Sequence, residues 1–149
     1  MKNHDFFLKT VIELAKESNC VSHKVGALLV KDSRIISMGY NGTPSGFHNC
    51  SDRFKSYTPD KREDHHKWSN SNEIHAEMNA ILYAAKNGVG TEGCSLYSTL
   101  FPCENCLKNI YQAGIREIFY IHEYDKQSSD SEFLNWLKSR IKIERLHLK

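Results

Sequence analysis

The feature that most constrains the fold of this chain is a set of metal-binding residue types in two distant segments. His75 stands two residues before Glu77, and Cys103 and Cys106 form a Pro-Cys-x-x-Cys pair. One imidazole and two thiolates suit zinc, and catalytic zinc sites keep three protein ligands so that a fourth position stays open. The fold is therefore expected to bring residues 75–77 and 103–106 to one point.

Two predicted helices carry these ligands. Residues 72–86 follow a run of Asn and Ser capping residues, precede Gly88 and have an apolar stripe at helical spacing. A second helix is predicted from Pro102, a good first helical residue, to Gly114. All four candidate residues would then lie in first helical turns. The stripe predicted to face the core consists of Ile74, Met78, Ile81, Leu82 and Ala85.

Two simpler interpretations of these residues are weaker. A core histidine with two unrelated free cysteines would explain each residue separately, but not their joint order and spacing. A structural zinc finger would need four protein ligands at this site and would leave Glu77 without a role. A catalytic metal centre is therefore the preferred interpretation.

Composition sets the broad class. The 149 residues are 40% hydrophobic and 26% charged, which predicts one globular domain over residues 1–149. The net charge of +2 gives no electrostatic reason to expect a nucleic-acid partner. We expect no membrane span and no signal peptide. Five cysteines without a secretory signal favour metal ligands or free thiols in a cytoplasmic compartment.

The predicted elements alternate between strands and helices. Further helices are expected at residues 4–18 and 131–139, and strands at 25–30, 35–40, 95–100, 117–122 and 142–148. The first two strands form a predicted hairpin, and residues 41–72 are expected to be mostly loop. Five strands interleaved with four helices predict an α/β fold: three α/β/α layers, with a mixed five-stranded sheet and helices on both faces.

With this order of elements, the motifs resemble those of the zinc-dependent cytidine and deoxycytidylate deaminases, closest to the phage-type deoxycytidylate (dCMP) deaminases. The resemblance covers about residues 20–126. It rests on Gly39-Tyr40-Asn41-Gly42, Asn72-Glu73-Ile74-His75-Ala76-Glu77, Phe101-Pro102-Cys103-x-x-Cys106, Gln112-Ala113-Gly114-Ile115 and Tyr124-Asp125-Lys126. It implies a cytidine deaminase-like fold, a catalytic zinc, and conversion of dCMP to dUMP for thymidylate synthesis. Many such enzymes are homohexamers that dCTP activates and dTTP inhibits.

Replacing the amine at C4 of cytosine by water needs a group that accepts a proton from the water and delivers protons to the ring and to the leaving amine. Glu77 is the residue assigned to these proton transfers. The resemblance implies a nucleotide pocket formed by Asn41, Ser69, Asn72, Ala76 and Tyr124. A 5′-phosphate would suit a helix N-terminus near residues 69–72. An ordinary Asn-Gly turn and helix capping are the alternative explanations of Asn41 and the Ser/Asn run.

A regulatory nucleotide site is also implied by the resemblance. Its candidate residues are Gly39, Tyr40, Asn41, Gly42, Tyr83 and Lys86. Lys86 is a point charge suited to a triphosphate, which Mg²⁺ could accompany. A lysine in the last turn of a helix is also a common partner of the helix dipole, and relatives often carry Arg there.

The phage branch further implies a second, structural zinc. Its ligands would be Cys20, Cys50, His65 and Glu73, a closed set of four. Unrelated surface histidines and buried cysteines are the alternative, since donors such as His23, His48 and Cys94 are plentiful in this chain.

Two rival functions stay open. Other deaminases of the same fold act on dCTP, free cytidine, guanine, a riboflavin precursor or tRNA adenosine, and the metal motif alone does not separate them. A zinc-stabilised nucleic-acid-binding module would be a different class, but it predicts a basic stripe and exposed stacking aromatics, which the sequence does not clearly offer, and it would not need Glu77.

Overall fold

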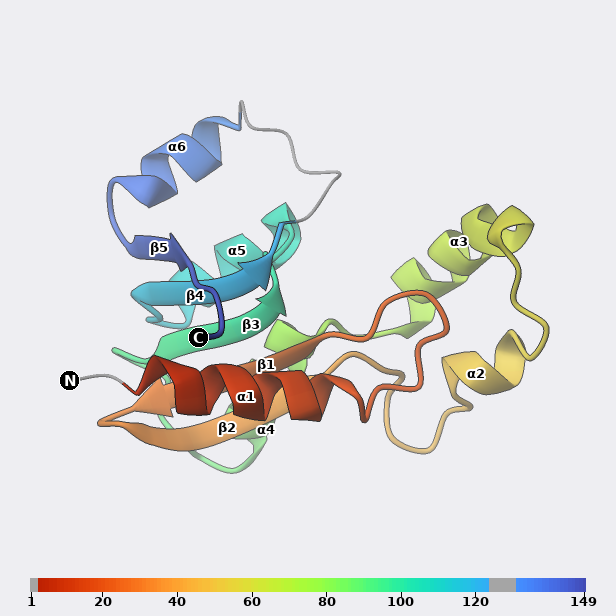
Figure 1. Ribbon diagram of the computed structural model, residues 1–149, viewed down its shortest axis with the longest axis horizontal. Coiled ribbons are helices and arrows are strands. Elements are labelled where there is room, and N and C mark those ends of the chain that lie inside the picture. Colours follow the sequence, from red (N-terminus) through yellow and green to blue (C-terminus); the bar gives the residue numbers. More distant parts are fainter. Residues whose placement is uncertain (1–2, 124–130) are drawn as a thin grey trace.

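The computed structural model describes residues 3–123 and 131–149 (Figure 1). Its strands are β1 (Gly26–Lys31), β2 (Arg34–Tyr40), β3 (Ser95–Leu100), β4 (Glu117–His122) and β5 (Lys142–Arg145). Its helices are α1 (His4–Ala15), α2 (Cys50–Arg53), the 3₁₀ turn η1 (Pro59–Lys61), α3 (Arg62–Asn72), α4 (Ala76–Lys86), α5 (Glu104–Gln112) and α6 (Glu132–Lys138).

The strands form one mixed five-stranded sheet in the order β2-β1-β3-β4-β5. β1 pairs antiparallel with β2 and β3, whereas β3, β4 and β5 run parallel. The predicted hairpin between β1 and β2 is confirmed. Its turn uses Asp32 and Ser33, whose φ angles of 52° and 61° are those of a tight hairpin turn.

Helices cover both faces of the sheet, which confirms the predicted three-layer α/β/α architecture. Alternate residues of a strand point to opposite faces, so Leu28 of β1 packs against Phe7 of α1, in a cluster on one side. Leu29 points the other way, into a larger cluster that includes residues of α4, α5 and α6. Each layer thus buries its own apolar side chains against the sheet.

The expectation that residues 41–72 are mostly loop is wrong. This segment contains α2, η1 and α3, and its helices stand out to one side of the sheet (Figure 1). Residues 62–72 show no apolar stripe in the sequence because the inward face of α3 carries mainly polar side chains. Hydrophobic periodicity therefore gives no signal for this helix.

The helix predicted over residues 72–86 begins only at Ala76, and its predicted buried face is right only in part: Met78 and Ile81 pack against the core, whereas the other predicted residues do not lie on the fully buried face. Ile74 lies before the helix in an extended bridge with Gly42. The alanines at positions 76, 80 and 84 face the sheet, while Leu82 is 48% exposed. Small residues are needed because α4 approaches β2 closely: a Cβ at Gly39 would lie 2.6 Å from the Ala76 carbonyl oxygen.

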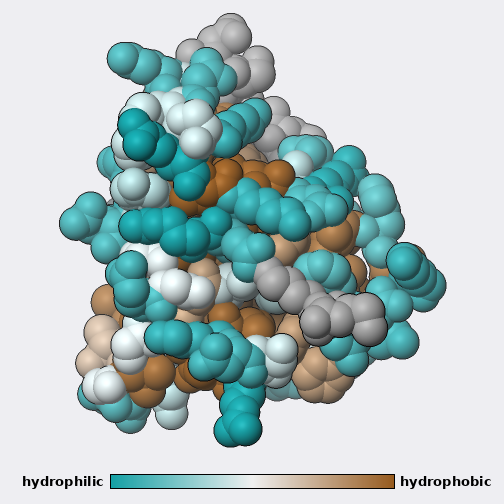
Figure 2. Space-filling view, turned by 90° about the vertical axis from the view of Figure 1, so that its left-hand side faces the viewer, coloured by the Kyte–Doolittle hydropathy of each residue, from teal (hydrophilic) through white to brown (hydrophobic). Residues whose placement is uncertain are grey.

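Other differences concern the ends of elements. The first helix ends at Ala15 rather than 18, and the last strand at Arg145 rather than 148. The helix predicted from Pro102 starts at Glu104. None of the helices within residues 3–123 and 131–149 is long and apolar enough to cross a membrane. Figure 2 shows a mainly hydrophilic face on which hydrophobic side chains gather only in small groups.

Candidate active site and metal centres

Two helix N-termini meet at the ends of the sheet strands. His75 is the N-cap residue of α4, and Cys103 is the N-cap residue of α5, which follows directly after β3. The prediction placed His75 and Cys103 inside the first turns of their helices, whereas both residues lie just before the first helical residue. Neither side chain makes a capping hydrogen bond. The imidazole and the thiol thus stay available to a ligand.

The three predicted ligands of the first cluster lie together. Nδ1 of His75 is 3.3 Å from Sγ of Cys106 and 3.5 Å from Sγ of Cys103, and all three donor atoms lie within 4.8 Å of one another. The hydrogen bond from the Cys106 thiol lowers the pKa of Cys103 and favours its thiolate. Three soft or borderline donors with room for a fourth ligand match the composition of a catalytic zinc site.

Glu77 lies beside this cluster and is 4% exposed. Burial raises the pKa of its carboxyl group, because desolvation penalises the charged form. A carboxyl group with a raised pKa is suited to accept and return a proton near neutral pH. Glu77 is the second residue of α4, so its backbone fixes it close to His75.

Sequence reasoning missed Ser98, which touches the Glu77 side chain. Its hydroxyl lies 3.3 Å from Oε1 of Glu77 and donates a 2.7 Å hydrogen bond to the Leu100 carbonyl oxygen. Ser98 is fully buried on β3. β3 also carries the buried hydroxyl residues Ser95 and Thr99, so polarity within the strand does not single out Ser98 in the sequence. The contact helps to hold the carboxyl group in one orientation.

A second cluster brings together Cys20, Cys50, His65 and Glu73. All four residues are buried, and their donor atoms lie within 4.8 Å of one another. Sγ of Cys20 is 3.5 Å from Nε2 of His65. Both carboxylate oxygens of Glu73 are buried without a hydrogen-bond partner, and His65 is 3.6 Å away, too far for a hydrogen bond.

An orphaned buried carboxylate is costly unless a cation compensates it. Together with the Glu73 carboxylate, the two thiols and the imidazole of this cluster form a closed set of four donors. Such a set fits a structural zinc ion. The donor chemistry and the unpaired oxygens therefore both fit a bound metal.

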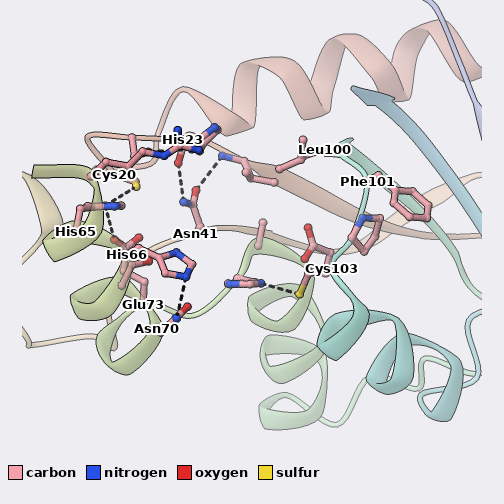
Figure 3. Close-up of a pocket in the computed structure, with 18 of the residues that line it drawn as sticks. Cys20, His23, Asn41, His65, His66, Asn70, Glu73, Leu100, Phe101 and Cys103 are labelled. Atoms are coloured by element: carbon pink, nitrogen blue, oxygen red, sulfur yellow. Dashed lines mark hydrogen bonds and ion pairs between the residues drawn. The ribbon is translucent and has the colours of Figure 1, made fainter. Parts of the chain in front are cut away.

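A pocket opens between the two clusters (Figure 3). Of the predicted substrate residues, Asn41, Ser69 and Ala76 line it. Asn72 is not among its lining residues, and its amide donates to the Trp68 carbonyl oxygen instead. Tyr124 lies outside the described residues.

Two hydrogen bonds to the backbone fix the Asn41 side chain. Oδ1 of Asn41 accepts from the Val25 amide at 2.9 Å, and its Nδ2 donates to the His23 carbonyl oxygen at 2.8 Å. Asn41 is thus held in one orientation in the pocket wall.

The phosphate position was predicted near residues 69–72 because a helix N-terminus was expected there, and this expectation is wrong. These residues form the last turn of α3, where free carbonyl oxygens rather than N–H groups collect.

The predicted regulatory residues do not form one site within a single subunit. Gly39 and Tyr40 belong to β2 rather than to a loop, and Gly42 is bridged to Ile74. Gly39 packs on the first turns of α4, whereas Tyr83 and Lys86 lie in its last turns, on the order of 10 Å further along the axis. An effector that contacts both groups would have to span α4 or lie between subunits.

Comparison with known proteins agrees with this site. The profile of the cytidine and deoxycytidylate deaminase zinc-binding region matches residues 1–122. The deoxycytidylate deaminase of Enterobacteria phage T2 is 41% identical over 152 residues, covering 78% of this chain and 80% of that protein. ComE operon protein 2 of Bacillus subtilis is 35% identical and covers 97% of this chain and 71% of that protein.

A solved structure gives the same result for the fold. The dCMP deaminase of cyanophage S-TIM5, in complex with dCMP and dUMP, has a TM-score of 0.77 and 33% identity, covering 98% of this chain and 99% of that chain. Sheet order, helix layers and the His/Cys/Cys cluster define a zinc-binding deaminase. The chain belongs to the cytidine and deoxycytidylate deaminase family.

Proposed function

We propose that this protein is a dCMP deaminase, which hydrolyses dCMP to dUMP and ammonia. The observation that carries the proposal is the buried Glu77 carboxyl group beside the cluster of His75, Cys103 and Cys106, in a pocket that Glu77, His75 and Cys103 line. The similarity to phage proteins named deoxycytidylate deaminase, and to a structure that contains dCMP and dUMP, supports the substrate.

In this proposal His75, Cys103 and Cys106 hold the catalytic zinc. When bound, zinc acts as a Lewis acid that lowers the pKa of water toward neutrality. The Glu77 carboxylate accepts a proton from the attacking water and delivers protons to N3 of the cytosine ring and to the departing amine. Its burial keeps bulk water away from these transfers.

Asn41 and Ala76 are proposed to position the nucleoside part of dCMP. Asn41 is fixed by two hydrogen bonds to the backbone, so the remaining lone pair and N–H of its amide can contact the sugar or the pyrimidine edge. Ala76 is fully buried at the start of α4 and leaves space for the flat base beside the metal cluster. Ser69 lines the same pocket from α3.

Product analysis tests the proposal directly. Protein stripped of metal by a chelator should not convert dCMP, and re-addition of stoichiometric zinc should restore formation of dUMP with an equal amount of ammonia. Zinc-loaded, folded protein that leaves dCMP unchanged would contradict the proposed function. Restoration of activity by magnesium alone would contradict the proposed metal.

We further propose a structural zinc at Cys20, Cys50, His65 and Glu73. Its support is the closed set of four buried donors and the two unpartnered oxygens of Glu73. The ligands come from the segment after α1, from α2, from α3 and from the segment before α4. A metal there would fix the helical region α2–α3 against the rest of the chain.

We also propose regulation by dCTP and dTTP in a homohexamer, with Mg²⁺ accompanying the triphosphate, and a cytoplasmic location. Exposed apolar side chains support the association of subunits in this proposal. Met38 and Tyr40 on the edge strand β2 are 47% and 40% exposed, and Leu82 and Tyr83 on α4 are 48% and 58% exposed. Exposed apolar side chains on an edge strand and its neighbouring helix suit a contact between subunits.

A charge reversal tests the regulation. Lys86→Glu should remove activation by dCTP and inhibition by dTTP, because a carboxylate repels a triphosphate, yet leave activity at saturating dCMP intact. In the wild type, dCTP should shift the dCMP saturation curve roughly 5–150-fold toward lower concentrations, a typical allosteric coupling. Lys138→Glu, in the last turn of α6, is the matched control. Hyperbolic wild-type kinetics insensitive to both triphosphates would contradict regulation.

A further inference from the structure

A three-residue segment joins the two metal-binding clusters. Residues 73–75, here called the connector, are all that lies between the end of α3 and the start of α4. The first residue of the connector, Glu73, belongs to the second cluster, and its last residue, His75, belongs to the catalytic cluster. Figure 3 shows Glu73 beside His65 on one side of the pocket and Cys103 on the other. A displacement of Glu73 therefore has a short path to a catalytic ligand.

Backbone hydrogen bonds restrain every residue of the connector. The Glu73 amide donates to the Ser69 carbonyl oxygen at 2.8 Å, which ties it to the last turn of α3. Ile74 pairs with Gly42 in both directions: its amide donates at 2.7 Å, and its carbonyl oxygen accepts at 3.1 Å. The His75 carbonyl oxygen accepts a hydrogen bond from α4 at 2.9 Å. Because each residue has only two soft dihedral angles, a connector bonded at every residue moves as a unit.

The two ends of the connector differ in how their side chains are held. The Glu73 side chain is 2% exposed, and both of its carboxylate oxygens lack a hydrogen-bond partner among the described residues. Since an unpaired buried carboxylate is costly, this position of Glu73 is favourable chiefly when a cation occupies the second cluster. The His75 ring is exposed and receives little support from packing. Its position therefore depends on the connector and on the sulfur contacts to Cys103 and Cys106.

Charge does not oppose occupancy of both clusters. When the second cluster holds zinc, its anionic donors are the two thiolates of Cys20 and Cys50 and the carboxylate of Glu73. These three negative charges outweigh the two positive charges of the ion. The loaded cluster is thus negative overall and does not repel a second cation in the catalytic cluster.

We infer that Glu73 is a positioning residue for the catalytic centre, because occupancy of the second cluster fixes Glu73 and the connector then holds His75 where it can share a metal with Cys103 and Cys106. The two clusters therefore bind zinc cooperatively. The inference rests on the proposed metal sites and not on the reaction. Linkage is reciprocal, so each cluster raises the zinc affinity of the other by the same factor.

Zinc affinities, measured by competition with a chelator, test this coupling without any turnover. Cys50→Ala keeps the ligands of the catalytic cluster, and Cys106→Ala keeps those of the second cluster. The product of the two zinc association constants of the wild type should exceed the product of the constants of these variants by roughly 5–150-fold, a typical coupling. Equal products would overturn the inference.

Hydrogen exchange tests whether the connector carries the coupling, and it needs only the Cys106→Ala variant. With one equivalent of zinc, the intact second cluster of this variant binds the ion. Exchange of the Gly42 and Ile74 amides, which bond to each other's carbonyl oxygens, should then slow by about the same 5–150-fold factor. Unchanged exchange at both amides would overturn the role of the connector.

Cys94→Ala is the matched control for the affinities, since Cys94 is a buried free cysteine outside both clusters. Its two association constants should equal those of the wild type. A decrease as large as that in the cluster variants would overturn the inference, because it would reflect general loss of stability. One zinc per chain in saturated wild type would also overturn it, even if dCMP is deaminated. Cooperative zinc binding by a wild type that does not deaminate dCMP would support the positioning role and contradict only the proposed reaction.

Discussion

Replacement of Glu77 by glutamine is expected to abolish turnover while the protein keeps its fold and its zinc. General acid–base catalysis is worth ~10²–10⁴ in rate, and Glu77 serves several transfers, so the loss in kcat should reach about 10⁴-fold or more. Glutamine has almost the same shape as glutamate but cannot carry the proton. Steady-state assay of ammonia release, with elemental analysis of the same sample, measures both quantities.

Glu104→Gln is the control for this experiment. Glu104 lies between the two cysteines of the cluster, but it is exposed in the first turn of α5 and does not line the pocket. It should retain wild-type activity. A Glu77→Gln enzyme that keeps more than roughly a tenth of wild-type activity would refute the assigned role, because general acid–base catalysis typically contributes ~10²–10⁴-fold.

Loss of the second metal should have the largest effect on stability. Wild-type protein is expected to contain two zinc ions per chain, and Cys50→Ala one. A ligand present at about a thousand times its Kd stabilises a protein by ~4 kcal/mol. Since each kcal/mol shifts Tm by ~2–4 °C in a chain of this size, we expect a decrease of ~8–16 °C in thermal unfolding.

Cys94→Ala is the matched control for this substitution. Cys94 is a buried free cysteine in the core, outside both clusters. Its replacement removes the same sulfur atom but should leave two zinc ions per chain and lower Tm less. One zinc per chain in metal-replete wild type, or equal effects of the two substitutions, would contradict the second site.

The part of this protein that the sequence predicted best is the part fixed by ligand chemistry. His75, Cys103 and Cys106 had to meet because zinc accepts few arrangements of donors, and the structure brings them within 4.8 Å of one another. The sheet was predictable for a similar reason. Its central strands β1, β3 and β4 are largely buried, and the register follows from which of their side chains face each helix layer.

The residues that sequence reasoning placed wrongly are those whose environment is set by packing partners. Leu82 was assigned to the buried face of α4, but it is 48% exposed, and the close approach of β2 at Gly39 favours small residues such as Ala76 and Ala80 on the face toward the sheet. α3 was missed because its inward face lines a pocket instead of a hydrophobic core, so a polar stripe replaces the apolar one. Ser98 carries no motif at all, and only the folded sheet places it under Glu77.

The central claim is most directly tested by comparing ammonia release from a panel of substrates with zinc-loaded protein. The panel consists of dCMP, dCTP, deoxycytidine, cytidine, guanine, the amine-bearing riboflavin precursor and a tRNA with adenosine at its anticodon. The proposal predicts the highest kcat/KM for dCMP, with dUMP as the product. A higher kcat/KM for any other member of the panel would contradict the assignment as a dCMP deaminase, and no release from any member would contradict catalysis by the Glu77 site.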